Sequence, residues 1–502
     1  MQESMAELFL HSPQTHILLL PLLLLPLLYF IISKHLIKKP RNPPLPPGPT
    51  PCPFLATIHL LKPLTHVSLA QLSQTYGPLI SLKLGMETLV VASSPAAAVE
   101  ILKTNDRTFS ARTVPHAVPL TASEIERLSF WGDALSDHLK NVRAICRAEL
   151  FSAKSLEAQR RLWQEKVAEM VGSLRTKEGA AVDLGRVVFA TVVNVFGNVL
   201  FSEDIVGVEE ERCCNEVRGF LRGIIQAISA PNLADFYPLF VGKFDPHGLR
   251  KKHRESSERM WGLWERVVRE RRRSAEAELK NRDFLDALIS RGFTDEEINK
   301  LFEELLTAGI DTTTSTINRT MLELLSSPES MIKLQQELHS VLNQDSLTDF
   351  PLEQLPYLQA CVKETLRLHP PAALLLAHRA RETCLVMNYT VPRDARVLVN
   401  VWAIGRDPTV WEEPVEYRPE RFLNSTRDFK GNDFELLPFG AGRRICPGLP
   451  MAAKIVPFLL AWLVYSFDWS LLDATVDETF RATSQMVQPL LLIPRARKMS
   501  PE

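Results

Sequence analysis

The chain has 502 residues, of which 45% are hydrophobic, and a formal net charge of -1. This length is enough for a large core, and the near-neutral charge gives no support for binding to nucleic acid. The seven cysteines form no CxxC pair and have no zinc-ligand spacing, so the sequence favours a reduced, cytosol-facing compartment.

The first predicted element is the uncharged run ILLLPLLLLPLLYFII at residues 17–32. As a helix it would be about 24 Å long, so it needs its flanks to cross a bilayer. Two glutamates precede the run and lysines follow it, which favours a lumenal N-terminus and a cytosolic body. A cleaved signal peptide, the alternative, would carry its positive charge first. We therefore expect a membrane anchor at residues 1–35.

A proline-rich stretch, RNPPLPPGPTPCP, follows the anchor. Proline at this density is stiff and non-helical, so residues 36–51 are predicted to form a hinge that sets the body off the membrane. Residues 52–502 would then form one globular body. Its size, about 450 residues, exceeds that of an ordinary single core and suggests organisation around a large buried ligand.

Apolar residues in the body recur mostly at helical spacing, whereas β-like runs are few and short. Two such runs lie near residues 79–93 and another near 395–404. The expected fold class is mainly α with a small β-rich lobe formed early in the chain. The basic stretch at 265–282 is interpreted as the solvated face of a helix.

A long helix is predicted to start at Thr294, because TDEE forms a capping box, and to end near Pro328. Its centre, AGIDTTT at 308–314, contains a glycine, an acidic residue and three threonines, all of which form helices less readily than Leu or Ala. Either something approaches the backbone here, or a crossing helix requires small residues. The sequence leaves both explanations open.

Two basic motifs predict a buried clasp. Glu364 and Arg367 in KETLR share a helix face, and Arg421 in PERF offers a second guanidinium. Alone, such a pair is weak evidence, because i,i+3 ion pairs are common on exposed helices. A carboxylate held by two guanidiniums would be a structural clasp.

The loop FGAGRRICPG places a single cysteine, Cys446, before an apolar segment that is predicted to be helical over 449–466. It is either one more buried thiol or a thiolate held in a fixed pose. A helix N-terminus favours a thiolate, and the glycines let the backbone wrap closely around the sulfur.

Taken together, these motifs resemble the cytochrome P450 family. FGAGRRICPG is similar to its haem-binding loop, AGIDTT to its oxygen-activating segment, KETLR to its Glu-x-x-Arg motif and PERF to its partner arginine. The resemblance covers essentially the whole chain and implies a cytochrome P450 fold, haem b and a monooxygenase or oxidase activity. The anchor and hinge resemble those of the microsomal members.

The resemblance also implies roles for individual residues. Cys446 would be the axial iron ligand, because a thiolate favours O–O cleavage. Asp311 and Thr312 match the acid–alcohol pair that delivers protons, while Ala308 and Gly309 leave room for dioxygen. The remaining residues match the haem loop or the propionate-binding positions (Phe439, Arg143, His378, Arg444) and the structural triad (Glu364, Arg367, Arg421).

Three departures from the family pattern are visible. Leu139 replaces a tryptophan four residues before Arg143, which removes one expected hydrogen bond to a propionate. Ala377 stands where proline is usual, and Arg319 stands for a tryptophan on the long helix.

The chain carries no flavin or nicotinamide fingerprint, so electrons must come from outside. The resemblance implies an NADPH–cytochrome reductase as partner, at the endoplasmic reticulum membrane. We expect it to dock on the cysteine side, near Arg427, Lys430 and Arg443.

Segments such as LPYLQACVKET and KFDPHGLRKKH are similar to those of the plant alkaloid-oxidising group, which hydroxylates, couples phenols or rearranges its substrates. Monoterpenol hydroxylases are the alternative. A haem-binding protein without turnover is favoured slightly by Leu139 and opposed by Asp311-Thr312. A scaffold without haem leaves Cys446 unexplained. By analogy, residues 113–125, 305–312, 372–377 and 484–488 would line the pocket, with Gln485, Gln488 and Glu124 as polar contacts.

Overall fold

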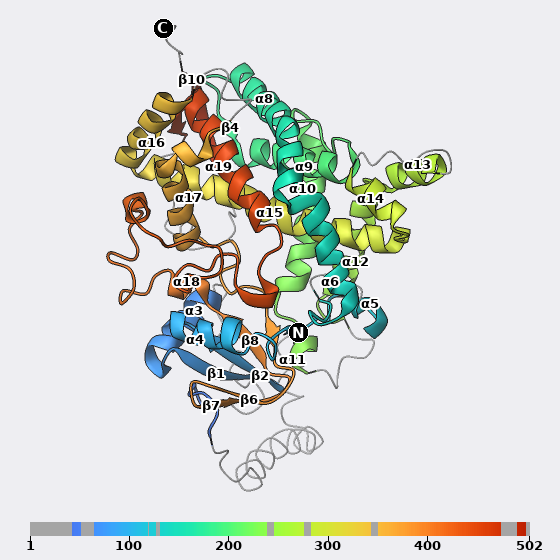
Figure 1. The fold of residues 1–502 in the computed structure, drawn as a ribbon, viewed down its shortest axis with the longest axis vertical. Helices are drawn as coiled ribbons and strands as arrows, with labels where there is room; N and C mark the ends of the chain where they lie inside the picture. Colours follow the sequence, from blue (N-terminus) through green and yellow to red (C-terminus); the bar gives the residue numbers. More distant parts are fainter. Residues whose placement is uncertain are drawn as a thin grey trace, which may run out of the picture.

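A computed structural model of the chain describes residues 43–51, 65–118, 120–126, 131–237, 245–275, 283–342, 350–472 and 489–497. The predicted anchor at 1–35 lies outside these residues, and so do residues 484–488 of the predicted pocket. The described part is mainly helical with small sheets, as expected. Figure 1 shows a large helical body and a smaller lobe that contains β1 and β2.

The helical body is built around α15 (Asp295–Ser326), which crosses its middle (Figure 1). The predicted capping box is confirmed: the Glu297 amide donates to Thr294 Oγ1 (3.3 Å), and the Thr294 amide donates to Glu297 Oε2 (2.9 Å). Helix α15 packs against three buried helices, α9 (Leu184–Phe201), α17 (Pro356–Leu368) and α19 (Leu449–Ser466). Although α9 and α19 are long and apolar enough to span a membrane, they are 83% and 72% buried in the body and serve as core helices.

Further helices surround this core. The longer ones are α3 (Thr65–Tyr76), α6 (Asp137–Cys146), α8 (Arg160–Thr176), α10 (Glu211–Ser229), α12 (Leu249–Trp261), α13 (Glu265–Ala275), α14 (Phe284–Ser290) and α16 (Pro328–Val341). The shorter ones include α4 (Pro95–Val99), α5 (Ala122–Glu126), α7 (Ala153–Ala158), α11 (Leu233–Phe236) and α18 (Val401–Ile404). Helix α13 carries the basic stretch. Arg266 and Arg269 are exposed on it as predicted, whereas Arg271 turns back to bind Asp283 and Asp286.

The β-rich lobe contains a five-stranded sheet in the order β1-β2-β8-β5-β3. Its strands are β1 (Leu79–Leu84), β2 (Glu87–Ala92), β8 (Arg396–Val399), β5 (His378–Arg379) and β3 (Ala111–Arg112). The expectation that this lobe forms early in the chain is therefore only half right. Strand β2 pairs in parallel with β8 from residues 396–399, because the long helical excursion returns the chain to the same sheet. The β3–β5 pairing places Arg112 opposite His378.

Two smaller sheets complete the fold. One has the order β4-β10-β9, with β4 (Val182–Asp183), β10 (Leu491–Ala496) and β9 (Phe467–Leu471). The other pairs β6 (Cys384–Val386) with β7 (Tyr389–Val391).

The described end of the hinge, residues 43–51, lies against the β-rich lobe. The Thr390 amide donates a hydrogen bond to the Pro44 carbonyl oxygen (2.7 Å), and the Ser81 amide donates one to the Pro47 carbonyl oxygen (2.9 Å). A Cβ on Gly48 would lie 1.9 Å from the Ser81 carbonyl oxygen, so this glycine permits the contact. This end of the hinge is thus fixed to the body.

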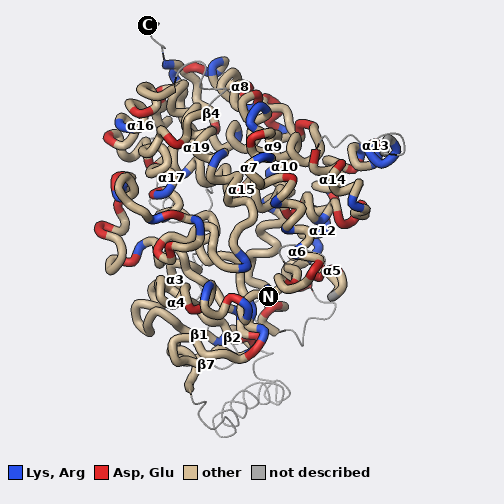
Figure 2. Tube along the Cα trace, in the orientation of Figure 1, with Lys and Arg blue, Asp and Glu red and all other residues tan. Residues whose placement is uncertain are grey.

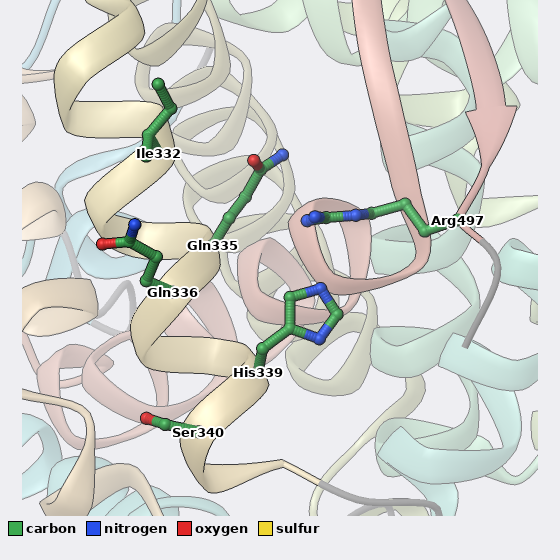
Figure 3. A pocket seen from close by; sticks show the side chains of 6 residues that line it. All are labelled: Ile332, Gln335, Gln336, His339, Ser340 and Arg497. Carbon is green, nitrogen blue, oxygen red and sulfur yellow. The ribbon is translucent and has the colours of Figure 1, made fainter. Parts of the chain in front are cut away.

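Along the chain trace in Figure 2, segments with Lys or Arg and segments with Asp or Glu are scattered over the molecule, and basic residues are grouped on α13. A pocket of about 550 Å³ lies between α16 and the residue that follows β10, and Figure 3 shows the side chains that line it. Its lining residues are Ile332, Gln335, Gln336, His339, Ser340 and Arg497, none of which is a predicted site residue.

Candidate functional site

The loop around Cys446 lies between a single 3-10 turn (Gly442–Arg444) and α19. Gly440 and Gly442 have left-handed φ angles of +70° and +65°, and a Cβ on Gly442 would lie 2.2 Å from the Leu102 carbonyl oxygen. Both positions therefore require glycine. Gly448 has an ordinary φ of -80° and would place its Cβ 3.8 Å from Cys446 Sγ, so the structure gives no steric reason for it.

The Cys446 thiol lies at the start of α19, as predicted. Its backbone amide donates to the Phe439 carbonyl oxygen (3.0 Å). Burial raises the pKa of the Cys446 thiol, while the amides of Gly448 and Leu449 and the Arg143 guanidinium act to lower it. In the protein alone, burial outweighs the favourable groups at the helix N-terminus. A metal cation at the sulfur would deprotonate the thiol outright.

Three arginines gather beside this loop: Arg112, Arg143 and Arg444. They donate to backbone carbonyl oxygens, Arg143 to Ile445 (2.8 Å), Arg444 to Ser110 (2.7 Å) and Arg112 to Leu376. His378 is 4% exposed, and its ring nitrogen Nδ1 donates to the Phe109 carbonyl oxygen (2.7 Å).

The three guanidiniums are close enough to perturb one another. Burial, followed by the charges of Arg444 and Arg143, lowers the pKa of Arg112 to about 9. Burial and Arg143 lower the pKa of Arg444 to about 10. Asp133 counters Arg444, but Arg381 already binds this carboxylate at 2.6 Å. Buried cations of this kind require anions.

The cluster has the composition that a haem dicarboxylate would need. Arg112 Nε is buried and has no hydrogen-bond acceptor among the described residues. Two propionate groups would supply the missing negative charge and an acceptor, while the nearby thiol would face the iron. These residues therefore fit haem.

Arg112 was not identified from the sequence. It follows TFSA in a short strand that carries no motif, and its partners are far away, the Leu376 carbonyl lying 264 residues along the chain. A buried arginine at a strand end leaves no periodic signal in the sequence, so tertiary structure was needed to find it.

The centre of α15 exposes Ala308 and Thr312, one turn apart, although Ile310 and Thr313 on the other faces are buried. This face of α15 thus borders space that no described side chain fills. Thr312 Oγ1 donates to the Ala308 carbonyl oxygen (2.6 Å), and the helix continues without interruption. No break of the kind that would expose backbone groups is seen here.

Gly309 has a packing role. A Cβ at this position would lie 2.1 Å from the Phe196 ring on α9. The crossing-helix explanation therefore accounts for this glycine, whereas the exposure of Ala308 supports the explanation that something approaches this face.

Asp311 points to a different neighbour from Thr312. Burial raises the pKa of its carboxyl, and Arg222 and Arg218 on α10 act to lower it. Arg218 lies 3.8 Å from the Asp183 carboxylate at the N-cap of α9. The acid and the alcohol are thus consecutive, with the acid turned towards basic residues of α10 and the alcohol on the exposed face.

The structure brings the three clasp residues together. Glu364 and Arg367 are fully buried and joined at 2.7 Å, and Arg421 lies 2.9 Å from the same carboxylate. Arg367 also donates to the backbone carbonyl oxygens of Gly405, Pro414 and Glu416. These bonds fasten α17 to the segment 405–421, which leads into the cysteine loop.

Two departures have clear structural settings. Leu139 is 1% exposed on α6, an apolar core position one turn before Arg143. Arg319 is also 1% exposed, and burial lowers its pKa to about 10 while the Glu323 carboxylate acts to raise it. Glu323 Oε1 lies 2.7 Å from His369 Nε2, so Arg319 adds a charge to a buried ionic group. Two residues before the third departure, Ala377, Leu375 adopts a left-handed φ of +53°.

The predicted polar pocket residue Glu124 and the predicted docking cations already have charged partners within the protein. Hydrogen bonds from Thr121 and the charge of Lys300 lower the pKa of Glu124 to about 2, and Lys300 Nζ lies 3.4 Å from its carboxylate. On the cysteine side the expected docking cations are each paired with an acid: Arg427 with Glu435, Lys430 with Asp428, and Arg443 with Asp106.

Comparison with known proteins agrees with this geometry. Residues 46–495 match the family model "Cytochrome P450". The chain is 44% identical over 477 residues to a probable (S)-N-methylcoclaurine 3'-hydroxylase isozyme 2 of Coptis japonica, covering 94% of this chain and 96% of the relative.

Two further relatives show the range of the similarity. Corytuberine synthase of Coptis japonica is 40% identical over 95% of this chain and 99% of its own length. Geraniol 8-hydroxylase of Catharanthus roseus is 38% identical over 94% of this chain and 98% of its own length. The chain is therefore a member of the cytochrome P450 monooxygenase family.

Proposed function

We propose that the chain is a haem-thiolate oxidase of plant specialised metabolism that acts on an alkaloid, with Cys446 as the iron ligand. The observation that carries this proposal is the half-buried Cys446 thiol beside one buried and two half-buried arginines, with too few carboxylates among the described residues to neutralise them. When bound, haem b supplies the iron at which dioxygen is reduced. Arg112, Arg143, Arg444 and His378 would hold its propionates, and Phe439 would lie in the loop beside the sulfur.

Replacing Arg112 tests whether this residue holds a haem propionate, because the change should stabilise the haem-free protein and weaken haem binding. In the haem-free protein, Arg112→Met removes a buried, repelled cation, so thermal unfolding is expected at a higher temperature. In the haem-loaded protein, the same change removes a propionate partner, so haem transfer to apomyoglobin is expected to be about tenfold faster. Arg393→Met, at an exposed arginine 3.6 Å from the Asp394 carboxylate, is the control and should change neither. Slower or unchanged haem transfer would contradict the role of Arg112.

Asp311 and Thr312 are proposed to move protons to the reacting oxygen. Because burial raises the pKa of Asp311, its carboxyl stays protonated to a higher pH than an ordinary aspartate and can act as an acid. Turnover is expected to fall as pH rises through this pKa, and Asp311→Asn should remove that dependence and lower kcat about a hundredfold. The pH–rate profile measures both effects.

Thr312→Ala should reduce the product formed per NADPH consumed. Thr316→Ala is its control, because Thr316 makes the same i-4 hydrogen bond (2.8 Å) one turn farther on. Equal losses in both variants would indicate a helix-stability effect and sink the proposed role of Thr312.

The alkaloid class is supported by the relatives named for (S)-N-methylcoclaurine hydroxylation and corytuberine synthesis. Geraniol 8-hydroxylase, slightly less similar, supports a monoterpenol as the second candidate. The chemistry would be hydroxylation or phenol coupling. An alkaloid ammonium that binds Glu124 would have to displace Lys300 from this carboxylate.

The proposal is tested with the chain expressed in microsomes. The carbon monoxide difference spectrum of the reduced protein is recorded first, and (S)-N-methylcoclaurine and geraniol are then added to the oxidised protein in turn. A thiolate-type Soret band that shifts with the alkaloid and not with geraniol is expected. A shift with geraniol alone would indicate a monoterpenol substrate instead of an alkaloid. A missing thiolate band would overturn the role of Cys446 as iron ligand.

Electrons are proposed to come from NADPH through a membrane-bound reductase at the endoplasmic reticulum, with residues 1–35 as anchor, 36–51 as hinge and 52–502 as catalytic body. Because Arg427, Lys430 and Arg443 each have an acidic partner, docking would depend on exchange of these ion pairs for contacts with the reductase.

A further inference from the structure

The segment from Arg427 to Phe434 wraps the loop that carries Cys446. Gly431, in this segment, has a φ of +86°, and a Cβ on it would lie 2.8 Å from Ile445 Cδ1 and 3.2 Å from the Gly440 carbonyl oxygen. Glycine permits this approach because it has no side chain and tolerates a positive φ. The two loops therefore touch directly beside the cysteine.

The start of this segment is fixed to the buried clasp. The guanidinium carbon of Arg427 lies 4.6 Å from the centre of the Trp411 ring, and that of Arg367 lies 5.2 Å from the same ring. Trp411 is 1% exposed and the Arg367 side chain is fully buried, whereas the Arg427 side chain is 36% exposed, so the ring links a buried cation to one near the surface. Lys363 on α17 also donates to the Arg427 carbonyl oxygen (3.1 Å). The segment thus begins on a rigid support.

Phe429 connects this segment to the cysteine loop by packing against Phe439. Its ring is 9% exposed and lies 5.3 Å from the Phe439 ring at an angle of 56°. The Phe439 carbonyl oxygen accepts the Cys446 amide (3.0 Å). A closed turn holds Phe429 in place, since the Asp428 amide donates to Asp433 Oδ2 (2.7 Å). Contacts therefore run from Phe429 through Phe439 to the backbone of Cys446.

We propose that Phe429 is a positioning residue for the thiolate. By holding Phe439 it fixes the carbonyl group that binds the Cys446 amide, and hence the direction of the sulfur. Aromatic pairs are directional, so an aliphatic side chain of similar volume holds Phe439, and with it the carbonyl that binds the Cys446 amide, less firmly. The inference rests on the proposed role of Cys446 as iron ligand and deepens it.

The test compares Phe429→Leu with Phe434→Leu in the full-length chain. Phe434 is the matched control, because it lies in the same segment and is equally buried (9% exposed) but packs in the separate core of the β-rich lobe. Both variants lose the same volume, so a merely structural loss of packing should appear equally in their unfolding temperatures.

Two readouts separate positioning from packing. In haem-free protein, labelling of Cys446 by iodoacetamide, followed by peptide mass spectrometry, is expected to be roughly threefold to tenfold faster in Phe429→Leu than in Phe434→Leu. In haem-loaded protein, Phe429→Leu should increase by a similar factor the ratio of thiol-type to thiolate-type carbon monoxide complex.

Equal labelling rates in the two variants would overturn the inference, whatever the haem spectrum shows. The parent spectrum reports separately on the proposed function. Faster labelling in Phe429→Leu, combined with no thiolate band in the parent, would support the positioning role of Phe429 for the cysteine loop and reject Cys446 as iron ligand.

Discussion

Replacing Cys446 with serine is expected to abolish the thiolate-type carbon monoxide spectrum and to remove measurable turnover. A serine hydroxyl is a poor ligand that stays protonated, so it cannot donate electron density to iron as a thiolate does. The arginine cluster is untouched by this change. Haem should therefore still associate with the protein, and its spectrum should lack the thiolate band.

The control for this change is Cys384→Ser on β6. Cys384 is a half-buried free thiol, and burial raises its pKa to about 11, so a generic effect of removing a thiol would appear there too. We expect the Cys384 variant to keep the parent spectrum and turnover. A thiolate-type band that survives in Cys446→Ser would show that another residue binds the iron.

The local features of the site could be predicted from the sequence because short-range rules determine them. The capping box at Thr294 and the helix that starts at Leu449 appear where the pattern places them. The clasp was also foreseen, since Glu364 and Arg367 share a helix face whatever the tertiary structure is.

The features that the sequence did not predict depend on segments that meet only in the folded protein. Arg112 becomes part of the site because β3 pairs with β5, more than 260 residues later. Gly309 has to be glycine because the Phe196 ring, on a different helix, leaves no room for a side chain there. The pKa of Cys446 is also set by tertiary burial, which outweighs the helix N-terminus that the sequence revealed.

The same distinction separates the two halves of the β-rich lobe. Alternation in LISLKL and TLVVA predicts β1 and β2, which form a local antiparallel pair. The parallel partner β8 is only four residues long, and α18 follows it directly where the sequence suggested a longer strand. A short apolar run does not show where a strand ends, so its extent had to come from the structure.

The second large effect is expected from Glu364→Gln, which should lower the free energy of unfolding by about 3–5 kcal/mol. The change keeps the shape of the side chain but leaves Arg367 and Arg421 buried without a counter-charge, at positions 2.7 and 2.9 Å from the former carboxylate. Urea unfolding followed by far-ultraviolet circular dichroism measures the loss.

Glu165→Gln is the matched control, because Glu165 lies 2.9 Å from Arg161 on α8 with both side chains more than half exposed. Such an exposed pair should cost no more than about 0.5 kcal/mol. Arg367→Lys adds a test of geometry: lysine keeps the charge but lacks the planar fork that also binds the carbonyls of Gly405, Pro414 and Glu416. A loss in Arg367→Lys close to that in Glu364→Gln would show that directed hydrogen bonds, as well as charge, hold α17 to the segment leading into the cysteine loop. A loss in Glu364→Gln as small as that in Glu165→Gln would mean that the clasp adds nothing to stability.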